Sequence, residues 1–274
     1  MSDPPPELLA VDIGNTHTDW ALFRGATLLE RGRGPTRPEG DEPSGWEVGL
    51  SRAPRGLPVV ACTVVPEIED LLSRAATAHG RTCHFLDHHS PLPFPLRYRL
   101  PGELGPDRLA NAIGAGLHAD PPYVVVDLGT ALTVDGVTRT GGYEGGAIAP
   151  GPAIIADYLH ERTARLPLLD LARARQATGI GRTTAEAMEI GCSVGMAGMA
   201  EALTAEVRRA LARIDGEEPV VLLTGGGHAW VRGTSVGEWP FYPDLTLEGL
   251  RSWATRFPLH PEAPHTDDGR IPTR

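Results

Sequence analysis

The sequence predicts an α/β protein with two similar half-domains, each a mixed β-sheet with flanking helices, and a ligand cleft between them. A short apolar run, Leu8 to Val11, ends at Asp12, and a second run, Tyr123 to Val126, ends at Asp127. Each aspartate opens an Asp-x-Gly turn that has a threonine close behind it and leads into another apolar run. The aspartates, at positions 12 and 127, lie 115 residues apart. A repeated strand–turn–strand unit favours two related halves that face each other.

The composition is that of a globular protein without a nucleic-acid or membrane partner. Of 274 residues, 41% are hydrophobic and 22% are charged, which is enough to build sizeable cores. The formal net charge of −10 disfavours nucleic acid and anionic membranes, because both require positive charge. The sequence has neither an apolar run of about 18 residues nor a basic start followed by an apolar segment. We therefore expect no membrane span, no secretory signal and a cytoplasmic location.

The first turn has the composition of a phosphate-binding loop. Gly14 lets the backbone come close to a ligand, and the backbone N–H groups, the Asn15 amide and the threonine hydroxyls can donate hydrogen bonds. Asp12 can hold a divalent cation through water. An ordinary hairpin turn uses the same residue types, so this stretch alone leaves both interpretations open. The similar turn at Asp127 favours the functional one.

The rest of the first half alternates strands and helices, which predicts a mixed sheet. Ala26 to Arg33 is expected to form a third strand, and the Pro-, Gly- and Glu-rich segment from Gly34 to Pro58 a surface connection with little periodicity. Val59 to Thr63 is predicted to be a short buried strand. Pro66 begins a run with apolar residues at helical spacing, and His84 to Leu86 is expected to form a further strand.

The start of the next predicted helix is a second place with candidate chemistry. Apolar residues recur at helical spacing from Leu109 to Leu117, which places Gly105 to Arg108 in the first turn. A helix N-terminus attracts anions and exposes free N–H groups. Arg108 could then clamp a carboxylate or phosphate, and Asp107 could act as general base for a hydroxyl. In the alternative interpretation Asp107 only complements the helix dipole.

Several glycines in the second half stand where the backbone is expected to approach a ligand or another segment closely. Gly145 and Gly146 would let a nucleotide or another chain come near, or would serve turns alone. Ile154 to Thr163 is predicted to be a helix. A long helical pattern then begins at Thr183 or Thr184, either of which would cap it. Three glycines interrupt this pattern, and their spacing permits close packing, for which a subunit interface is one candidate: Gly191, Gly195 and Gly198.

The C-terminal part is predicted to complete the second half-domain. Val220 to Leu223 has the composition of a buried strand, and it ends in a glycine-rich turn, Thr224 to Gly227, that is expected to line the adenosine side of the cleft. Asp244 to Trp253 is expected to form a closing helix. Residues 261–274 have the composition of a disordered tail.

Several common sites are excluded. The sequence has no H-E-x-x-H zinc motif and no G-x-x-x-x-G-K-[ST] loop. The three cysteines form no C-x-x-C pair and are expected to be reduced and buried. The chain contains no lysine, so phosphate would be bound by backbone N–H groups, hydroxyls, arginine and a cation.

The motifs together resemble a known family. The first hairpin resembles the phosphate loop of the superfamily that includes actin, hexokinase and the heat-shock chaperone ATPases, and the full set is similar to type III pantothenate kinase. The motifs occur in that family's order and span most of residues 8 to 253: DIGNTHTDWALF (Asp12 to Phe23), YRLPGELGPDRLANAIGA (Tyr98 to Ala115), DLGTALTVDGV (Asp127 to Val137), YEGGAIAPG (Tyr143 to Gly151), ERTARLPLL (Glu161 to Leu169), GRTTAEAMEIG (Gly181 to Gly191), TGG (Thr224 to Gly226) and DLTLEGL (Asp244 to Leu250).

The resemblance implies a kinase that transfers the γ-phosphoryl group of ATP to the primary hydroxyl of pantothenate, the first step towards coenzyme A. It implies Asp107 as the catalytic proton acceptor, Mg²⁺ near Asp12 through water, and a monovalent cation, K⁺ or NH₄⁺, at Asp127. The implied ATP site consists of Asp12, Ile13, Gly14, Asn15, Thr16, His17, Thr18, Asp19 and Thr130. The implied pantothenate site consists of Tyr98, Gly105, Pro106, Asp107, Arg108 and Thr184, the last from the partner subunit of a homodimer.

We therefore expect two ribonuclease H-like half-domains, residues 1–118 and 119–260, with ATP between them. Two rival functions stay open. One is another small-molecule kinase or phosphatase of the same superfamily, and the other is a non-catalytic regulatory relative that acts as an accessory factor in transcription. The acid at Asp107 and the negative net charge favour the kinase over the regulator.

Overall fold

Two β-sheets with the same strand order form the framework of the protein. The computed structural model describes residues 7–175 and 177–257. The first sheet has the order β3-β2-β1-β4-β5 and the second the order β8-β7-β6-β9. The strands are β1 (Leu8–Ile13), β2 (His17–Arg24), β3 (Thr27–Pro35), β4 (Val59–Thr63), β5 (Cys83–Phe85), β6 (Tyr123–Leu128), β7 (Ala131–Thr138), β8 (Gly142–Pro150) and β9 (Val220–Thr224).

The direction and register of the strands repeat between the sheets as well. β1 is antiparallel to β2 and parallel to β4, and β6 is antiparallel to β7 and parallel to β9. Asp12 lies opposite Asp19 and Cys62, and Asp127 lies opposite Thr133 and Thr224. Both aspartates therefore sit at the same point of the same topology, and the predicted fold of two ribonuclease H-like halves is confirmed.

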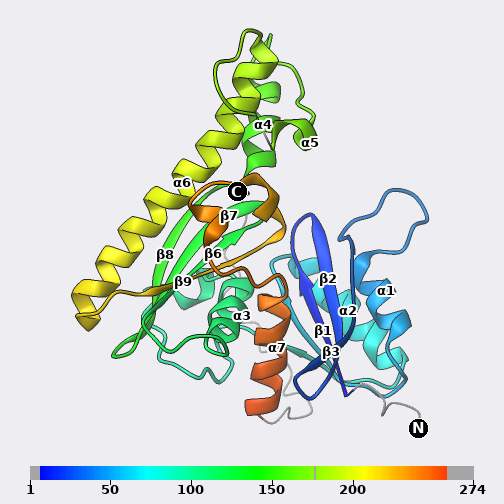
Figure 1. The fold of residues 1–274 in the computed structure, drawn as a ribbon. Coiled ribbons are helices and arrows are strands. Elements are labelled where there is room, and N and C mark those ends of the chain that lie inside the picture. The colour runs from blue at the N-terminus through cyan, green and yellow to red at the C-terminus, as the bar shows by residue number, and fades with distance from the viewer. Residues whose placement is uncertain (1–6, 176, 258–274) are drawn as a thin grey trace.

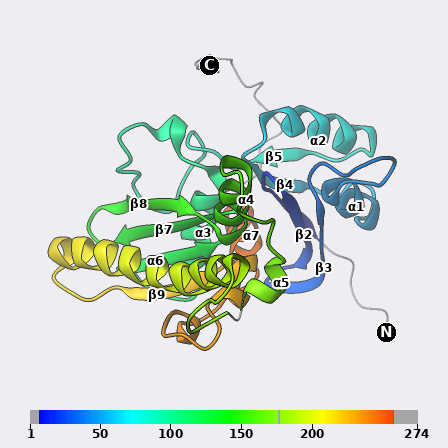
Figure 2. The same ribbon diagram turned by 90° about the horizontal axis from the view of Figure 1, so that it is seen from above.

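The helices separate and cover the sheets (Figure 1; Figure 2). The helices α3 and α7 lie between the two sheets, α1 and α2 cover the outer face of the first, and α4 and α6 cover the outer face of the second. The helices are α1 (Gly45–Arg52), α2 (Pro66–Ala78), α3 (Pro106–Ala115), α4 (Pro152–Arg162), α5 (Leu171–Ala174), α6 (Thr184–Asp215) and α7 (Leu245–Arg256), with short 3₁₀ turns at Pro101–Glu103, Gly226–Trp230 and Val236–Glu238. None of the helices within the described ranges is long and apolar enough to cross a membrane.

Successive side chains of the central strands point to opposite faces of each sheet, and the two faces pack against different helices. In β1, Leu9 and Val11 face the outer helices of the first sheet, whereas Ala10 faces α3 and α7. In β6, Val124 faces the outer helices of the second sheet, and Val125 faces α3 and α7. Both central strands are buried on two faces, which explains why they read as continuous apolar runs.

The helices α3 and α7 touch through their backbones. A Cβ atom at Gly114 would lie 2.3 Å from the carbonyl oxygen of Leu245, and one at Gly249 would lie 1.9 Å from that of Ala110. Only glycine permits this approach. α7 also contacts β1, β2 and β4, so this helix packs against the first sheet as well.

Most predicted elements are present, with two corrections. The segment Gly34 to Pro58 was expected to be irregular, but it contains α1, whose start is fixed by a capping box in which the Ser44 side chain accepts from the backbone N–H of Glu47 and the Glu47 side chain accepts from that of Ser44. Gly145 and Gly146 do not form a turn. They lie in β8, where a Cβ atom at Gly146 would be 1.8 Å from the carbonyl oxygen of Val134 in the neighbouring strand.

Both predicted helix starts are confirmed. The helix that follows Gly105 begins at Pro106 as predicted, and Thr183 is the residue that caps α6. The short helix α5 was not predicted. The domain limits at residues 118 and 119 stay predictions, and the predicted tail, residues 261–274, lies outside the described residues.

Candidate active site

The two acidic turns open onto one cleft of about 500 Å³ between the sheets. The side chains of Thr16, in the first turn, and Thr130, in the second, meet with their Oγ1 atoms 3.3 Å apart. The expected convergence of the two turns is therefore confirmed. The lining residues that matter for the chemistry come from both turns, from α3 and from the third glycine-rich turn: Asp12, Gly14, Asn15, His17, Asp19, Asp107, Asp127, Gly129, Thr130, Thr224, Gly225 and Gly226.

Five aspartates line this cleft: Asp12, Asp19, Asp107, Asp127 and Asp244. Burial raises the pKa of Asp12 well above its usual value, and repulsion from Asp107 and Asp19 adds to this effect. Burial also raises the pKa of Asp127, to about 7, although a hydrogen bond from Asn111 opposes the shift. Asp19 shows the same upward pKa shift from burial, which the charge of Arg33 partly offsets. Such a site holds more negative charge than its own side chains neutralise, so it favours cations.

Asp107 lies in the first turn of α3 and contributes to the cleft lining. Its Oδ1 atom accepts a hydrogen bond of 2.9 Å from the backbone N–H of Arg108. A Cβ atom at Gly105 would lie 2.4 Å from the same oxygen, so a glycine is needed beside this carboxylate. Burial raises the pKa of Asp107, while the N–H of Arg108 opposes the rise. A carboxylate with a raised pKa at the cleft is suited to accept a proton.

Arg108 makes a buried ion pair within the chain. Arg108 is 4% exposed, and its Nε donates to both oxygens of Asp135 at 3.1 and 3.0 Å. The Tyr143 hydroxyl donates to Asp135 Oδ1 at 2.7 Å, and the guanidinium lies over the Tyr98 ring, 5.8 Å from its centroid. Two of its donors are thus engaged by Asp135. The role of Arg108 as a substrate clamp stays a prediction, and any such contact would use its remaining N–H groups.

Several residues of the site were not singled out from the sequence. Asn111, 1% exposed, donates from Nδ2 to Asp127 Oδ2 at 2.8 Å and accepts at Oδ1 from the Thr246 hydroxyl at 2.7 Å. Asp135 is the buried partner of Arg108. The one local signal for Asn111 was its place four residues after Asp107, since a polar side chain on that face of a helix is unusual among apolar neighbours.

Two arginines on β3 supply the positive charge that lines the cleft. Arg33 pairs with Asp19, with Nη1 3.1 Å from Oδ2, and Arg31 pairs with Asp244 at the start of α7. Both arginine side chains are about half exposed. In a chain without lysine, these side chains can reach a bound anion.

The aspartates of the cleft supply the oxygen donors that a hard cation prefers. Within residues 7–175 and 177–257, no three acidic, histidine or cysteine side chains converge to form a metal site on their own. Carboxylate oxygens are the ligands that Mg²⁺ and similar cations prefer, and Mg²⁺ is commonly held by one or two carboxylates together with water and phosphate. Asp12 and Asp127 supply this donor type at the cleft. The three cysteines form no disulfide and are buried, as predicted, and Cys62 donates its thiol hydrogen to Asp12 Oδ1 at 3.3 Å.

Thr184 lies elsewhere in the chain. It is the first residue of α6, which begins beside α4 and α5 and far from α3 (Figure 1; Figure 2). It is not among the residues that line the cleft of a single chain. A role in substrate binding would therefore require a second subunit.

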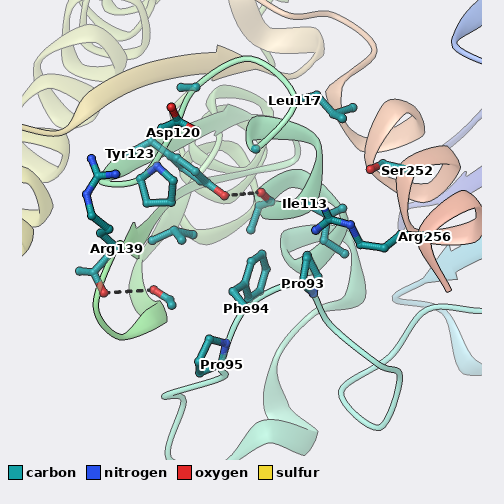
Figure 3. A pocket seen from close by; sticks show the side chains of 17 residues that line it. Pro93, Phe94, Pro95, Ile113, Leu117, Asp120, Tyr123, Arg139, Ser252 and Arg256 are labelled. Carbon is teal, nitrogen blue, oxygen red and sulfur yellow. Dashed lines mark hydrogen bonds between the residues drawn. The ribbon is translucent and has the colours of Figure 1, made fainter.

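A second cavity, of about 260 Å³, lies at the opposite end of α3 (Figure 3). Its lining is mainly apolar, including Phe94, Ile113 and Leu117, with Arg139 and Arg256 on opposite sides. Arg139 is already paired with Glu217. None of the cleft's aspartates lies in this second cavity.

The repeated topology, with an acidic turn from each sheet facing one cleft, defines an actin-like ATPase fold of two ribonuclease H-like halves. A Campylobacter jejuni crystal structure, of a protein named for the Baf family of transcriptional activators, has a similar fold with a TM-score of 0.57. The two sequences are 17% identical, and the aligned region covers 90% of this chain and 98% of the Campylobacter jejuni chain. At this identity the similarity shows the fold alone.

The family follows from the sequence comparisons. The profile of type III pantothenate kinase matches residues 8–206. The type III pantothenate kinase of Akkermansia muciniphila is 39% identical over 89% of this chain and 96% of its own length, and that of Rhodospirillum centenum is 36% identical over 89% and 96%. The chain belongs to the type III pantothenate kinase family.

The raised pKa of Asp127 predicts how stability depends on pH. The folded-state pKa of about 7 exceeds the value of about 3.9 for an unfolded chain, so the folded state binds the proton more tightly. The stabilisation from this proton is complete below about pH 4 and is lost as the pH rises through 7. Between pH 5 and pH 7.5 the unmodified chain should lose unfolding free energy as Asp127 gives up its proton. Asp127→Asn has no such proton, so its loss over the same pH range should be smaller by about 2 kcal/mol.

Urea denaturation of the metal-free protein at both pH values measures this difference. Asp70→Asn, on the exposed side of α2, is the control and should keep the pH dependence of the unmodified chain. An Asp127→Asn protein with the same loss of stability as the unmodified chain would contradict the assignment.

Proposed function

We propose that this chain transfers the γ-phosphoryl group of ATP to the primary hydroxyl of pantothenate and forms 4′-phosphopantothenate, the first step of coenzyme A biosynthesis. The observation that carries the proposal is the convergence of Asp12, Asp107 and Asp127 on one cleft, with Thr16 in contact with Thr130. Membership of the type III pantothenate kinase family supports the choice of acceptor.

In the proposed reaction the acceptor hydroxyl attacks the γ-phosphorus. Asp107 takes the hydroxyl proton as the new O–P bond forms, and the bond to the β–γ bridging oxygen breaks, so that ADP leaves with the electron pair. The buried position that raises the pKa of Asp107 brings it nearer to neutral pH, where a general base is most effective. Most of the remaining catalysis comes from alignment and charge stabilisation.

The phosphates of ATP would lie between the two turns. The backbone and side chains from Asp12 to Asp19 and the hydroxyl of Thr130 supply donors from opposite sides of the cleft. Arg31 and Arg33 border the same space. The adenosine would lie towards Gly225 and Gly226, as expected from the third glycine-rich turn.

Two cations complete the proposed site. Asp12 would hold Mg²⁺ through water, and Asp127 would hold K⁺ or NH₄⁺. These ions would neutralise charge that builds on the phosphates, a role that lysine has in many other kinases. The pKa values of Asp12 and Asp127 are raised mainly by burial, with repulsion from Asp107 added, and a bound cation would favour the charged form of both carboxylates.

Pantothenate would bind beside Asp107. The first turn of α3, Gly105 to Arg108, and the ring of Tyr98 would form its site, with Thr184 supplied by the partner subunit. The homodimer is supported by the surface of α6. A Cβ atom at Gly191, Gly195 or Gly198 would meet nothing within 4 Å, and Val194, on the same side of the helix, is 53% exposed.

Other expected properties rest on the sequence. The absence of a nucleic-acid or membrane partner follows from the net charge of −10 and stays a prediction, as does the cytoplasmic location. A purely regulatory role would leave Asp107 without a use. A sugar kinase of the same superfamily would use the same cleft with another acceptor.

An acceptor assay separates these functions. ADP production is measured with pantothenate, with hexose sugars and with no acceptor, each with and without potassium. We expect turnover with pantothenate only, and a higher rate in potassium. Asp107→Asn should reduce turnover by about 10² to 10⁴-fold, because it removes the proton acceptor, while ATP binding measured by calorimetry persists.

The unmodified chain without acceptor gives the background of ATP hydrolysis. Phosphorylation of a sugar but not of pantothenate would refute the substrate. Unchanged turnover in Asp107→Asn would refute the proton acceptor.

The dimer is tested on α6. Gly195→Arg places a long charged side chain in the middle of the exposed glycine face, so we expect a monomer in light scattering and roughly 10²-fold lower turnover, since Thr184 of the partner is lost. Ala210→Arg, at an exposed position further along the same helix, should remain a fully active dimer. A Gly195→Arg monomer with full activity would show that each subunit has a complete site.

A further inference from the structure

Two consecutive hydrogen bonds connect α7 to the second acidic turn through α3. The Thr246 hydroxyl donates to Asn111 Oδ1 at 2.7 Å, and Asn111 Nδ2 donates to Asp127 Oδ2 at 2.8 Å. Asn111 is 1% exposed, so water does not replace either contact easily. The three side chains come from α7, α3 and β6, which no segment of local sequence brings together.

The hydroxyl of Thr246 determines which side of the amide faces Asp127. An amide can present either its NH₂ group or its oxygen, and only the NH₂ group stabilises a carboxylate. A donor on the oxygen side of Asn111 holds the amide in the required orientation. The approach of α7 that makes this contact possible depends on the backbone packing at Gly114 and Gly249.

The second oxygen of Asp127 is confined by glycine. A Cβ atom at Gly225 would lie 2.3 Å from Asp127 Oδ1, and one at Gly129 would lie 3.5 Å from it. Oδ1 therefore lies between the second acidic turn, at Gly129, and the glycine-rich turn at Gly225, and both turns line the cleft. With Oδ2 bound by Asn111, the carboxylate has one defined orientation.

Asn111 and Asp107 belong to the same face of α3. They are four residues apart, a little more than one helical turn, and both lie on the side of α3 towards the cleft. One rigid helix thus fixes the proposed proton acceptor relative to Asp127. The first turn of α7 is itself tied to the first sheet, because Asp244 pairs with Arg31.

We infer that Asn111 is a positioning residue that orients Asp127 towards the bound cation and nucleotide, and that Thr246 of α7 holds Asn111 in the orientation this requires. The inference rests on the proposed function of Asp127 as the monovalent-cation site. It gives α7, acting through Asn111, an influence on how well potassium supports ATP binding. Neither Asn111 nor Thr246 touches the reacting atoms.

The test measures ATP binding without an acceptor. The dissociation constant of an ATP analogue with a non-hydrolysable β–γ bridge is determined by calorimetry, with Mg²⁺, in potassium chloride and in tetramethylammonium chloride. The ratio of the two constants is the potassium effect. For the unmodified chain we expect tighter binding in potassium.

Three threonine variants isolate the hydroxyl. Thr246→Val keeps the shape of the side chain and should reduce the potassium effect by about three- to tenfold, the value of a single hydrogen bond. Thr246→Ser should restore it. Thr255→Val, the same substitution on an exposed turn of α7, where the hydroxyl bonds only to the carbonyl of Arg251, should have no effect.

Asn111→Leu removes the donor to Asp127 and should reduce the potassium effect by tenfold or more, about the value of a hydrogen bond to a charged group. Its fold is checked by thermal unfolding, and the threonine variants decide the question if this buried substitution prevents folding.

The inference is overturned if Thr246→Val keeps the full potassium effect, if Thr246→Ser behaves like Thr246→Val, or if the unmodified chain binds the analogue equally well in both salts. The proposed function fails separately. A chain that shows the potassium effect but phosphorylates another alcohol would refute pantothenate as substrate and leave the role of Asn111 intact.

Discussion

The electrostatic cost of gathering carboxylates in one cleft is the constraint on which the rest of the structure depends. Asp12, Asp107 and Asp127 are each carried by a different element. Burial raises the pKa of all three, and repulsion from Asp107 adds to the shifts of Asp12 and Asp127. Such an arrangement is unfavourable in the empty protein. The packing of the two sheets against the helices between them holds the carboxylates together, and in the proposed function cations and the phosphates of ATP offset the repulsion.

The absence of lysine makes the electrostatic cost of the gathered carboxylates harder to offset within the chain. Many phosphate-binding sites use a lysine as a mobile positive charge, whereas this cleft offers only half-exposed arginines, Arg31 and Arg33, that are already paired with acids. The guanidinium of Arg108 is likewise bound to Asp135. In the proposed function, positive charge at the centre of the cleft comes largely from the bound cations. The repeated topology provides one acidic turn from each sheet for this purpose.

The sequence was sufficient for features that depend on neighbouring residues and insufficient for those that depend on distant ones. The paired hairpins, the central strands and the start of α3 follow from apolar periodicity and from turn residues. The helix α1 was missed in a Pro- and Gly-rich segment, although Ser44 and Glu47 have the spacing of a capping box. The contact between Asn111 and Thr246 spans 135 residues, so only the packing of α7 against α3 reveals it.

The central claim is that both acidic turns bind one nucleotide. A crystal structure with a non-hydrolysable ATP analogue and Mg²⁺ tests it most directly. The account predicts that the phosphates lie between the turns, within hydrogen-bonding distance of the backbone at Gly14 to Thr16 on one side and of the Thr130 hydroxyl on the other, with the γ-phosphate facing Asp107. Phosphates bound to one turn alone, with the other open to solvent, would contradict it.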